Sequence, residues 1–458
     1  MNKTWGFIIV LVSILRAQAQ PAVTTEKPVA KFTKGFANAV KQMPYNRLVQ
    51  SAGKVITYGN PELENHALDV TILADKKNVV AEDRYGIAII DAKTNVIATQ
   101  WSFSDSAAYK DLMSTYSGIA SFVYNNETYV VWGAQGAGAN RGFVVIAEVN
   151  KNKMGKVSFI QCKAIAPAKV AIPNSVAINM ENNTPFLYVV LNGNNKLIKI
   201  NAVNHETEWA ANTGEAPFGI CIVNNKAYIT NWAGETVTDT TQEHAGTPWG
   251  SVYTNPVTGA TKEGSVSVID ISNGQKINKL MVGLHPNVII KSKDERFVYV
   301  ANGNSDNISV IDVKKEQVID SISVGLFLRQ NRYYGSSPDG LCINADGTKL
   351  FVANGLDNAI AVIKLGSIIS VNGNGKTKVQ GYIPTEAYPS GIAYFNNRLY
   401  VANLEAKGAD VLSEVHELKR ANDNPLKPFS IHKELTSVSV ILSNNSSVKC
   451  IHTKSKEA

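Results

Sequence analysis

The sequence predicts an all-β fold, a seven-bladed β-propeller built from four-stranded antiparallel blades. Three features of the chain support this prediction: a motif that recurs along it, four short alternating runs within each copy, and a strand-like segment near the N-terminus that has no unit of its own. Internal repeats of about 40 to 50 residues are typical of propellers.

The recurring motif is clearest between residues 285 and 403. It reads YVAN at 299–302, FVAN at 351–354 and YVAN at 400–403, each time after an apolar run and before a turn. Related units begin near residues 64, 117, 172 and 216, so that seven units fit between residues 53 and 442.

The unit that begins at residue 285 shows what each copy contains. Apolar and polar residues alternate in runs at 287–291, 297–301, 308–313 and 318–324, and Gly, Asn, Asp and Lys fill the turns between them. Alternation with a period of two is typical of half-buried strands. A four-stranded unit cannot bury both faces alone, so the units are expected to pack around a common axis; a solenoid would need shorter and more uniform periods.

The last unit lacks one clear strand. Its runs lie at 391–394, 398–402 and 437–442, and the segment GKVITYG at 53–59 resembles an outer strand without a blade. We therefore predict that residues 55–58 complete the seventh blade and remove an exposed strand edge. The alternative is that residues 446–452 supply this strand.

The N-terminus resembles an export signal. Lys3, an apolar run over residues 5–15 and the triplet Ala17-Gln18-Ala19 predict a signal peptide at 1–19, followed by a linker at 20–43, the propeller at 44–442 and a tail at 443–458. Gln20 stands where a lipoprotein would carry Cys. We expect an exported monomer, periplasmic or secreted, with no integral membrane segment after signal cleavage.

Composition excludes several classes of function. The net charge is +7, but the 45 basic and 38 acidic residues are interspersed, which does not indicate a nucleic-acid partner. The four cysteines lie far apart, and Cys221 and Cys342 occupy equivalent apolar strands, where core packing is expected. The chain has no HExxH, GxSxG, P-loop or GxGxxG motif. No cofactor and no metal are therefore expected.

The repeat cores resemble the YVTN-type propeller family. The stretches TNWAGETVTDT, EGSVSVIDISNGQKI, YYGSSPDGL and GYIPTEAYPSGIA, in that order, are similar to one subgroup in which a propeller precedes an alkaline-phosphatase-type phosphoesterase domain in one polypeptide. The resemblance covers roughly residues 44–442. It implies a propeller that works together with a phosphoesterase.

The phosphoesterase motif of that subgroup, of the Glu-Asn-Arg-Thr-Tyr-Asp kind, does not occur in these 458 residues. We therefore expect a non-catalytic recognition or scaffold module that docks a phosphoesterase-type partner domain or an envelope ligand. One alternative is a propeller hydrolase, lactonase-like or phosphoesterase-associated, with its site at the mouth of the central channel. Another is a truncated remnant without a role of its own.

Propeller geometry indicates where a ligand would bind. Loops that enter each blade and loops that join its second and third strands open on one face, and two long insertions, residues 232–264 and 326–336, fall there. They supply the candidate partner face: Trp232, Glu235, His244, Trp249, Tyr253, Arg329, Arg332, Tyr333 and Tyr334. The alternative is that the insertions only pack on each other as a lid.

Four further residues begin or precede inner strands and are expected at the channel mouth: His66, Asn174, His285 and Ser390. The prolines that open the inner strands and the asparagines that close the second strands are expected to be structural. We interpret Ser337-Pro338-Asp339-Gly340 as a tight turn rather than a catalytic fragment.

Overall fold

The computed structural model describes residues 41–42, 48–60, 63–116, 118–138, 140–234, 236–247, 250–326, 335–365, 377–406, 410–411, 429–430 and 435–443. All of them belong to one compact unit, which begins at Phe36. The expected signal peptide, the linker except for Lys41–Gln42, and the tail beyond residue 443 lie outside the described residues.

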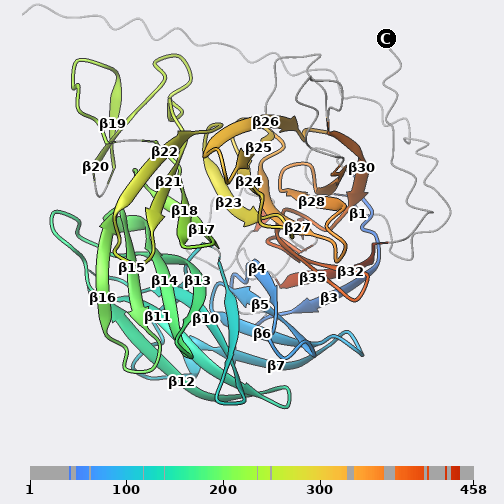
Figure 1. Cartoon of the computed structure of the whole chain (residues 1–458). Coiled ribbons are helices and arrows are strands. Elements are labelled where there is room, and N and C mark those ends of the chain that lie inside the picture. Colours follow the sequence, from blue (N-terminus) through green and yellow to red (C-terminus); the bar gives the residue numbers. More distant parts are fainter. Residues whose placement is uncertain are drawn as a thin grey trace, which may run out of the picture. The chain divides into compact units, whose positions relative to one another are not determined.

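Seven antiparallel sheets surround a central channel, which confirms the predicted seven-bladed propeller (Figure 1). Inner strands of neighbouring blades lie side by side around the channel. From the inside outwards, blades 1 and 3 to 6 are β4 (Ala67–Ile72), β5 (Asn78–Asp83), β6 (Gly86–Asp91), β7 (Val96–Ser102); β13 (Pro173–Glu181), β14 (Thr184–Leu191), β15 (Lys196–Asn201), β16 (Thr207–Asn212); β17 (Pro217–Val223), β18 (Lys226–Asn231), β21 (Ser265–Asp270), β22 (Lys276–Met281); β23 (Pro286–Lys291), β24 (Phe297–Asn302), β25 (Asn307–Asp312), β26 (Gln317–Ser323); and β27 (Pro338–Ile343), β28 (Lys349–Asn354), β29 (Ala359–Lys364), β30 (Lys378–Pro384).

Blade 2 is less regular than the others. Its inner position is shared by β8 (Met113–Ser114) and β9 (Ala120–Tyr124), which both pair with β10 (Glu127–Gln135); β11 (Gly142–Asn150) and β12 (Lys153–Cys162) follow outwards. Three two-stranded pairs lie outside the blades: β1 (Lys41–Gln42) with β2 (Leu48–Val49), β19 (His244–Thr247) with β20 (Gly250–Tyr253), and β33 (Asp410–Val411) with β34 (Phe429–Ser430). Two short 3-10 turns are η2 (Phe103–Asp105) and η3 (Asn192–Asn194).

Blade 7 is closed by the two ends of the propeller sequence. Its strands are β31 (Pro389–Phe395), β32 (Arg398–Asn403), β35 (Thr436–Leu442) and, on the outside, β3 (Lys54–Tyr58). Val55 pairs with Ser439 and Tyr58 with Thr436, as the sequence predicted. Pairing with β3 satisfies the backbone groups of β35 that would otherwise form an open edge.

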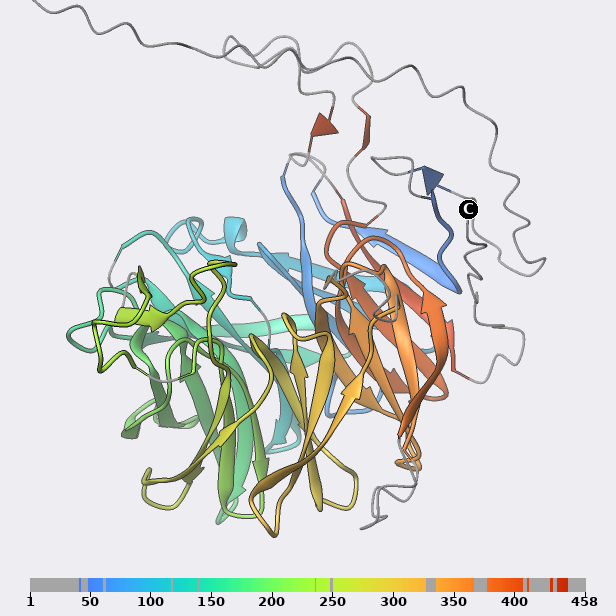
Figure 2. The ribbon, with the colours of Figure 1, turned by 90° about the horizontal axis from the view of Figure 1, so that it is seen from above.

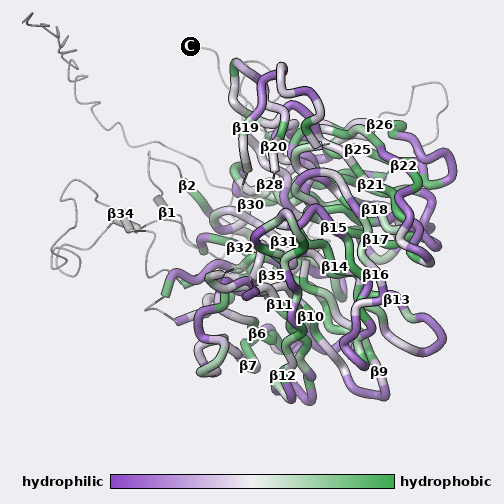
Figure 3. The backbone as a smooth tube through the Cα atoms, turned by 90° about the vertical axis from the view of Figure 1, so that its left-hand side faces the viewer, coloured by the Kyte–Doolittle hydropathy of each residue, from purple (hydrophilic) through white to green (hydrophobic). Residues whose placement is uncertain are grey.

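Each blade is apolar on both faces because it is packed between two others. In β24, Tyr299 and Ala301 join one apolar cluster with blade 6, whereas Val298 and Val300 join another with blade 4. Alternate side chains of one strand therefore serve two interfaces, and the strand is buried throughout. Figure 3 shows the apolar segments along the strands and the polar ones at the loops.

The ring has two faces, which lie above and below the blades in Figure 2. We call the face where the inner strands begin and the second strands end the loop-rich face. Four second strands end there in a buried asparagine: Asn231, Asn302, Asn354 and Asn403. Asn403, for example, donates from Nδ2 to Ser437 Oγ (3.1 Å) and Ser439 Oγ (3.0 Å), which supports the structural role expected of these residues.

Candidate functional site

The rim of the channel on the loop-rich face has an unusual backbone. Five inner strands begin with proline, and each residue before the proline has a φ between 47° and 54° (Ile172, Ala216, His285, Ser337 and Tyr388). This left-handed conformation is unfavourable for such residues before proline, so the surrounding structure must hold it. Backbone bonds do so, among them Gly303 N to His285 O (2.9 Å) and Gly355 N to Ser337 O (2.8 Å).

Four aromatic rings form an arc at the channel mouth. Phe218, the second residue of β17, stacks on Trp232 with ring centroids 4.6 Å apart, and His285 stacks on the other side of Trp232, also at 4.6 Å. Tyr116 lies 5.6 Å from Trp232 and is 50% exposed. The arc therefore joins blades 4 and 5 to the entry of blade 2 and presents a ring to solvent.

A chain of hydrogen bonds continues the arc towards blades 6 and 7. Trp232 Nε1 donates to Asn287 Oδ1 (3.1 Å), and Asn287 Nδ2 donates to Asp339 Oδ1 (2.6 Å). Ser337 Oγ donates to Asp339 Oδ2 (3.0 Å), and Tyr388 also hydrogen-bonds this carboxylate. Burial raises the pKa of Asp339 to about 6, although these bonds favour its ionised form.

A second carboxylate reaches the channel from blade 1. Asp69 Oδ1 accepts from Val70 N (2.8 Å) and Asp69 Oδ2 from Gly118 N (2.9 Å). Burial raises its pKa to about 6 against these bonds. Protein surrounds Asp69 and Asp339 almost completely, yet both side chains keep partial exposure. That exposed surface therefore faces the channel.

Glu82 lies behind Asp69 and is the most unusual carboxylate in the described residues. It is directly across from Asp69 in the β4–β5 ladder and 1% exposed, and neither of its carboxylate oxygens has a hydrogen-bond partner among the described residues. Burial, followed by repulsion from Asp69 and Asp83, raises its pKa well above the usual range. Alternation along β5 directs Glu82 towards blade 2, since Val80 clusters with Trp132 there.

Positive charge is scarce around these carboxylates. The one basic residue on the described inner strands is Lys291, at the opposite end of β23, where it pairs with Glu295 (2.5 Å). On the loop-rich face, Arg84 pairs with Glu64 (3.0 Å) and Arg141 with Asp111. The mouth of the channel is thus acidic in a chain whose net charge is +7.

The four residues predicted for the channel mouth lie at the starts of inner strands in blades 1, 3, 5 and 7. Asn174 Nδ2 donates to Phe218 O (3.0 Å) and Ser390 Oγ donates to Ala67 O (2.6 Å), so these two side chains bridge neighbouring blades. His66 lies 3.4 Å from Glu64, and burial lowers the pKa of both histidines, His66 and His285.

Three residues of the predicted partner face are described. Trp232 belongs to the aromatic arc, and His244 is exposed on β19 with Nδ1 2.8 Å from Gln242 O. Tyr253 accepts from Thr238 N and Asp239 N (both 2.9 Å), which ties the insertion together internally. The remaining predicted residues lie outside the described residues: Glu235, Trp249, Arg329, Arg332, Tyr333 and Tyr334.

Sequence reasoning missed Asp69, Glu82 and Asp339. Pro338-Asp339-Gly340 was interpreted as a turn, but these residues begin β27, and only Ser337 before them has the turn-like φ. The signal that could have identified Asp339 is its alignment with Asn174, Asn287 and Ser390, each the residue after the proline that begins an inner strand.

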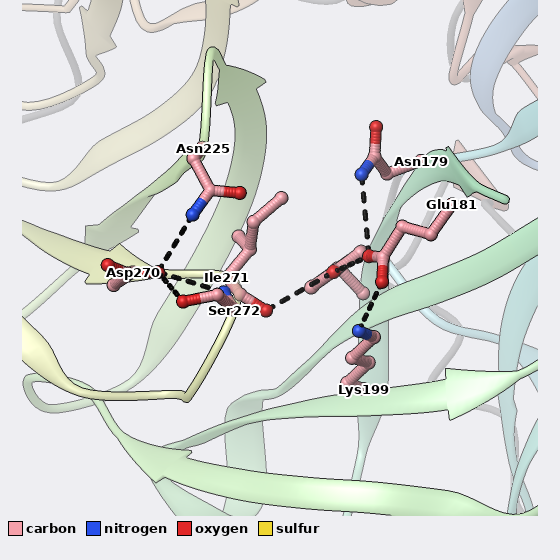
Figure 4. Close-up of polar contacts among 8 residues, drawn as sticks. Asn179, Glu181, Lys199, Asn225, Asp270, Ile271 and Ser272 are labelled. Atoms are coloured by element: carbon pink, nitrogen blue, oxygen red, sulfur yellow. Dashed lines mark hydrogen bonds and ion pairs between the residues drawn. The ribbon is translucent and has the colours of Figure 1, made fainter.

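The opposite end of blades 3 and 4 holds a second polar network, shown in Figure 4. Lys199 Nζ pairs with Glu181 Oε2 (2.6 Å), and Tyr188 OH donates to Glu181 Oε1 (2.5 Å). Lys199 is 7% exposed and lies 4.2 Å from the centroid of Phe186. Its charge is paired and its stem packed, so we assign this network to stability.

Other kinds of site are not found in the part of the chain that the structure describes. No three His, Cys, Asp or Glu side chains there cluster as metal ligands would. Among the same residues, no helix has the length and apolar character needed to cross a membrane. Cys162, Cys221 and Cys342 are buried, and burial raises the pKa of Cys162 and of Cys221 to about 12.

Comparison with known proteins supports the fold. The sequence matches no family model and no curated protein. Hydrazine synthase from Kuenenia stuttgartiensis superposes with a TM-score of 0.51 at 13% identity, over 76% of this chain and 94% of that chain. The WD40 repeats of RRP9 (TM-score 0.56, 8% identity, 86% of this chain and 99% of that one) and U3-55K (0.56, 7%, 84% and 98%) are also similar. At these identities the likeness establishes a generic β-propeller fold, which is consistent with a scaffold or recognition module.

Proposed function

We propose that the protein is a non-catalytic recognition module that docks a partner on its loop-rich face. The observation that carries the proposal is the blade 4 insertion, residues 232–264, which we call the arm. Its strands β19 and β20 pair with each other and with no blade (Figure 1). An ordered element that leaves the ring without completing a blade is suited to contact another molecule.

The arm is built to keep its form while exposed. Its base is fixed by Glu215, which is 2% exposed: Thr236 Oγ1 donates to Glu215 Oε1 and Asn195 Nδ2 to Glu215 Oε2, both at 2.5 Å. Farther out, Val257 is 90% exposed. A fixed base with an apolar residue in solvent loses little conformational freedom when a partner covers it.

The family resemblance supplies the proposed partner. Because the repeats resemble the YVTN-type subgroup fused to a phosphoesterase, we propose that a phosphoesterase-type domain or an envelope protein docks here, and that the module is an exported monomer. Sequencing downstream of codon 458 in all three frames tests the pairing. A frame that encodes the phosphoesterase motif supports it, and its absence redirects the search to other envelope ligands.

Deleting residues 237–261 tests the docking itself. The variant should keep a folded ring by circular dichroism, because no blade strand is removed. Proteins captured from envelope extracts by the wild-type chain are purified and their binding is measured with both forms. Binding that requires the arm supports the proposal. Lys315→Gln, an exposed change on the opposite face, is the matched control. Equal binding with and without the arm would remove the proposal.

A second candidate is a propeller hydrolase with its site at the channel mouth. The carboxyls of Asp69 and Asp339, whose pKa values are raised to about 6, are suited to proton transfer near neutral pH. This candidate predicts turnover of a phosphodiester or lactone that is lost in Asp339→Asn or in His66→Ala. Inert wild-type protein on both substrate classes would discard it.

A further inference from the structure

The two channel carboxylates lie close together across one blade. A Cβ placed on Gly340 would lie 3.2 Å from Gly391 Cα, and one placed on Gly391 would lie 2.4 Å from Asp69 Oδ1. The inner strands of blades 6, 7 and 1 therefore touch at this level. Blade 7 contributes only Ser390, whose hydroxyl is bonded to Ala67 O, and Gly391. Asp339 and Asp69 thus flank a stretch with no bulky side chain.

The negative charge of this region is not balanced from within the described chain. Asp69 and Asp339 are held by neutral donors, namely backbone N–H groups, an amide and hydroxyls. Glu82 adds a carboxylate behind Asp69 whose two oxygens have no partner among the described residues. Buried carboxylates in native proteins are normally paired, so this arrangement favours a cation from outside.

The aromatic arc adjoins the carboxylates and suits the same kind of ligand. Trp232 is connected to Asp339 through the single amide of Asn287. A cation attracted by a carboxylate and lying near an aromatic ring gains about 0.5 to 2 kcal/mol from the ring quadrupole. Tyr116, half exposed at the outer end of the arc, widens this aromatic surface.

The chemistry favours an amine or guanidinium over a metal ion. A hard cation such as Ca²⁺ needs six to eight oxygen ligands at 2.3–2.6 Å, and no three metal-ligating side chains cluster in the described residues. The donors on Asp69 and Asp339 fix both carboxylates in place and leave lone pairs directed at the channel. Charge-assisted N–H bonds of about 2.7–2.9 Å can use those lone pairs singly.

We propose that the channel mouth is a cation-recognition site in which Asp69, Asp339 and the arc around Trp232 receive an arginine or lysine side chain presented by the docked partner. This inference rests on the proposed function and names the chemistry of the partner. The arm contacts the body of the partner, and the mouth recognises one basic side chain.

Saturation-transfer NMR on the full chain tests the site with defined probes. The peptide acetyl-Gly-Gly-Arg-Gly-Gly-amide is compared with the same peptide carrying citrulline, which has nearly the same shape but no charge. We expect the arginine peptide to bind at least about tenfold more tightly, which corresponds to about 1.4 kcal/mol. Equal binding of the two peptides, or no binding of either, would overturn the proposal.

Variants locate the binding. Asp339→Asn and Asp69→Asn should each weaken the arginine peptide by about tenfold, while Asp294→Asn, an exposed change on the opposite face, should leave it unchanged. Circular dichroism checks folding, and Asp339→Asn carries the test if Asp69→Asn does not fold. Binding indifferent to both changes at the mouth would refute the site.

Two further arms separate the sources and the proposals. Free arginine that binds as tightly as the peptide would mean a small-molecule site and would overturn the role of a partner side chain. Ca²⁺ that displaces the peptide stoichiometrically would likewise refute the amine. If docking of a purified partner requires the arm but is unaffected by Asp69→Asn and Asp339→Asn, this inference fails and the proposed function stands.

Discussion

Glu82→Gln is the substitution whose effect the structure defines most closely. The side chain is buried at the interface of blades 1 and 2, and its oxygens make no hydrogen bond to the described residues, so the amide replaces the carboxyl without breaking a bond that the structure shows. The change removes one titrating group and keeps the shape. Its effect on stability should therefore depend on pH.

The sign follows from the direction of the pKa shift. Because the pKa of Glu82 is raised in the folded state, the folded chain keeps a proton that the unfolded chain, with a carboxyl pKa near 4.3, has released. Its contribution is fully favourable below about pH 4.3 and is lost as the pH rises towards the folded pKa. Each unit in this window costs about 1.4 kcal/mol, so the loss reaches about 3 kcal/mol near pH 6.5.

Urea unfolding of both proteins, followed by circular dichroism and tryptophan fluorescence, measures this difference. Glu82→Gln should be close to neutral at about pH 4.5 and should stabilise the protein by about 2–3 kcal/mol at about pH 6.5. Removing Glu82 also relieves its repulsion of Asp69, which acts in the same direction. Glu208→Gln, on the exposed outer strand β16, is the control and should show no such trend. A difference that is constant with pH would refute the reasoning.

Three further outcomes are expected. Ile56→Ala on β3, where the side chain is 7% exposed, should lower the unfolding free energy by about 2–4 kcal/mol in urea titrations; a loss below about 1 kcal/mol would contradict closure of blade 7 by this strand. Glu181→Gln should cost about 1–3 kcal/mol at neutral pH, because Lys199 loses its paired charge, with the partial exposure of Glu181 keeping the figure modest. Burial alone would raise the pKa of Glu181, but bonds from Lys199 and Tyr188 lower it overall, so this difference should shrink in acid as the pH falls through the folded pKa. Cys162, Cys221 and Cys342 should resist alkylation in the native protein and react after denaturation, as peptide mapping would show; rapid labelling of any of them in the native state would contradict the burial that raises their pKa.

Much of the architecture could be predicted from local patterns. The runs expected in blade 5 agree with β23 to β26 to within one residue at each end, and residues 55–58 form the outer strand of blade 7 as predicted. These features succeed because strand alternation and turn residues are short-range signals, and because a repeat shows the same signal seven times.

The site was predicted only in part. The prolines and insertions indicated the face, and His66, Asn174, His285 and Ser390 lie where inner strands begin. The electrostatic character of the mouth was not visible in the sequence. Asp69 and Asp339 look like ordinary acidic residues near turns, and their raised pKa values come from neighbours as distant in sequence as Gly118 and Asn287.

By itself, the sequence determined the class of fold, the number of blades and the way the ring closes, because each of these depends on patterns that repeat within a few tens of residues. Only the tertiary structure decided what the channel mouth contains. Closing the ring brings Gly391 of the last blade against Asp69 of the first, and it places Glu82 where water is excluded and no described group can pair with it. Burial and charge balance are properties of that three-dimensional enclosure, and no local pattern in the chain records them.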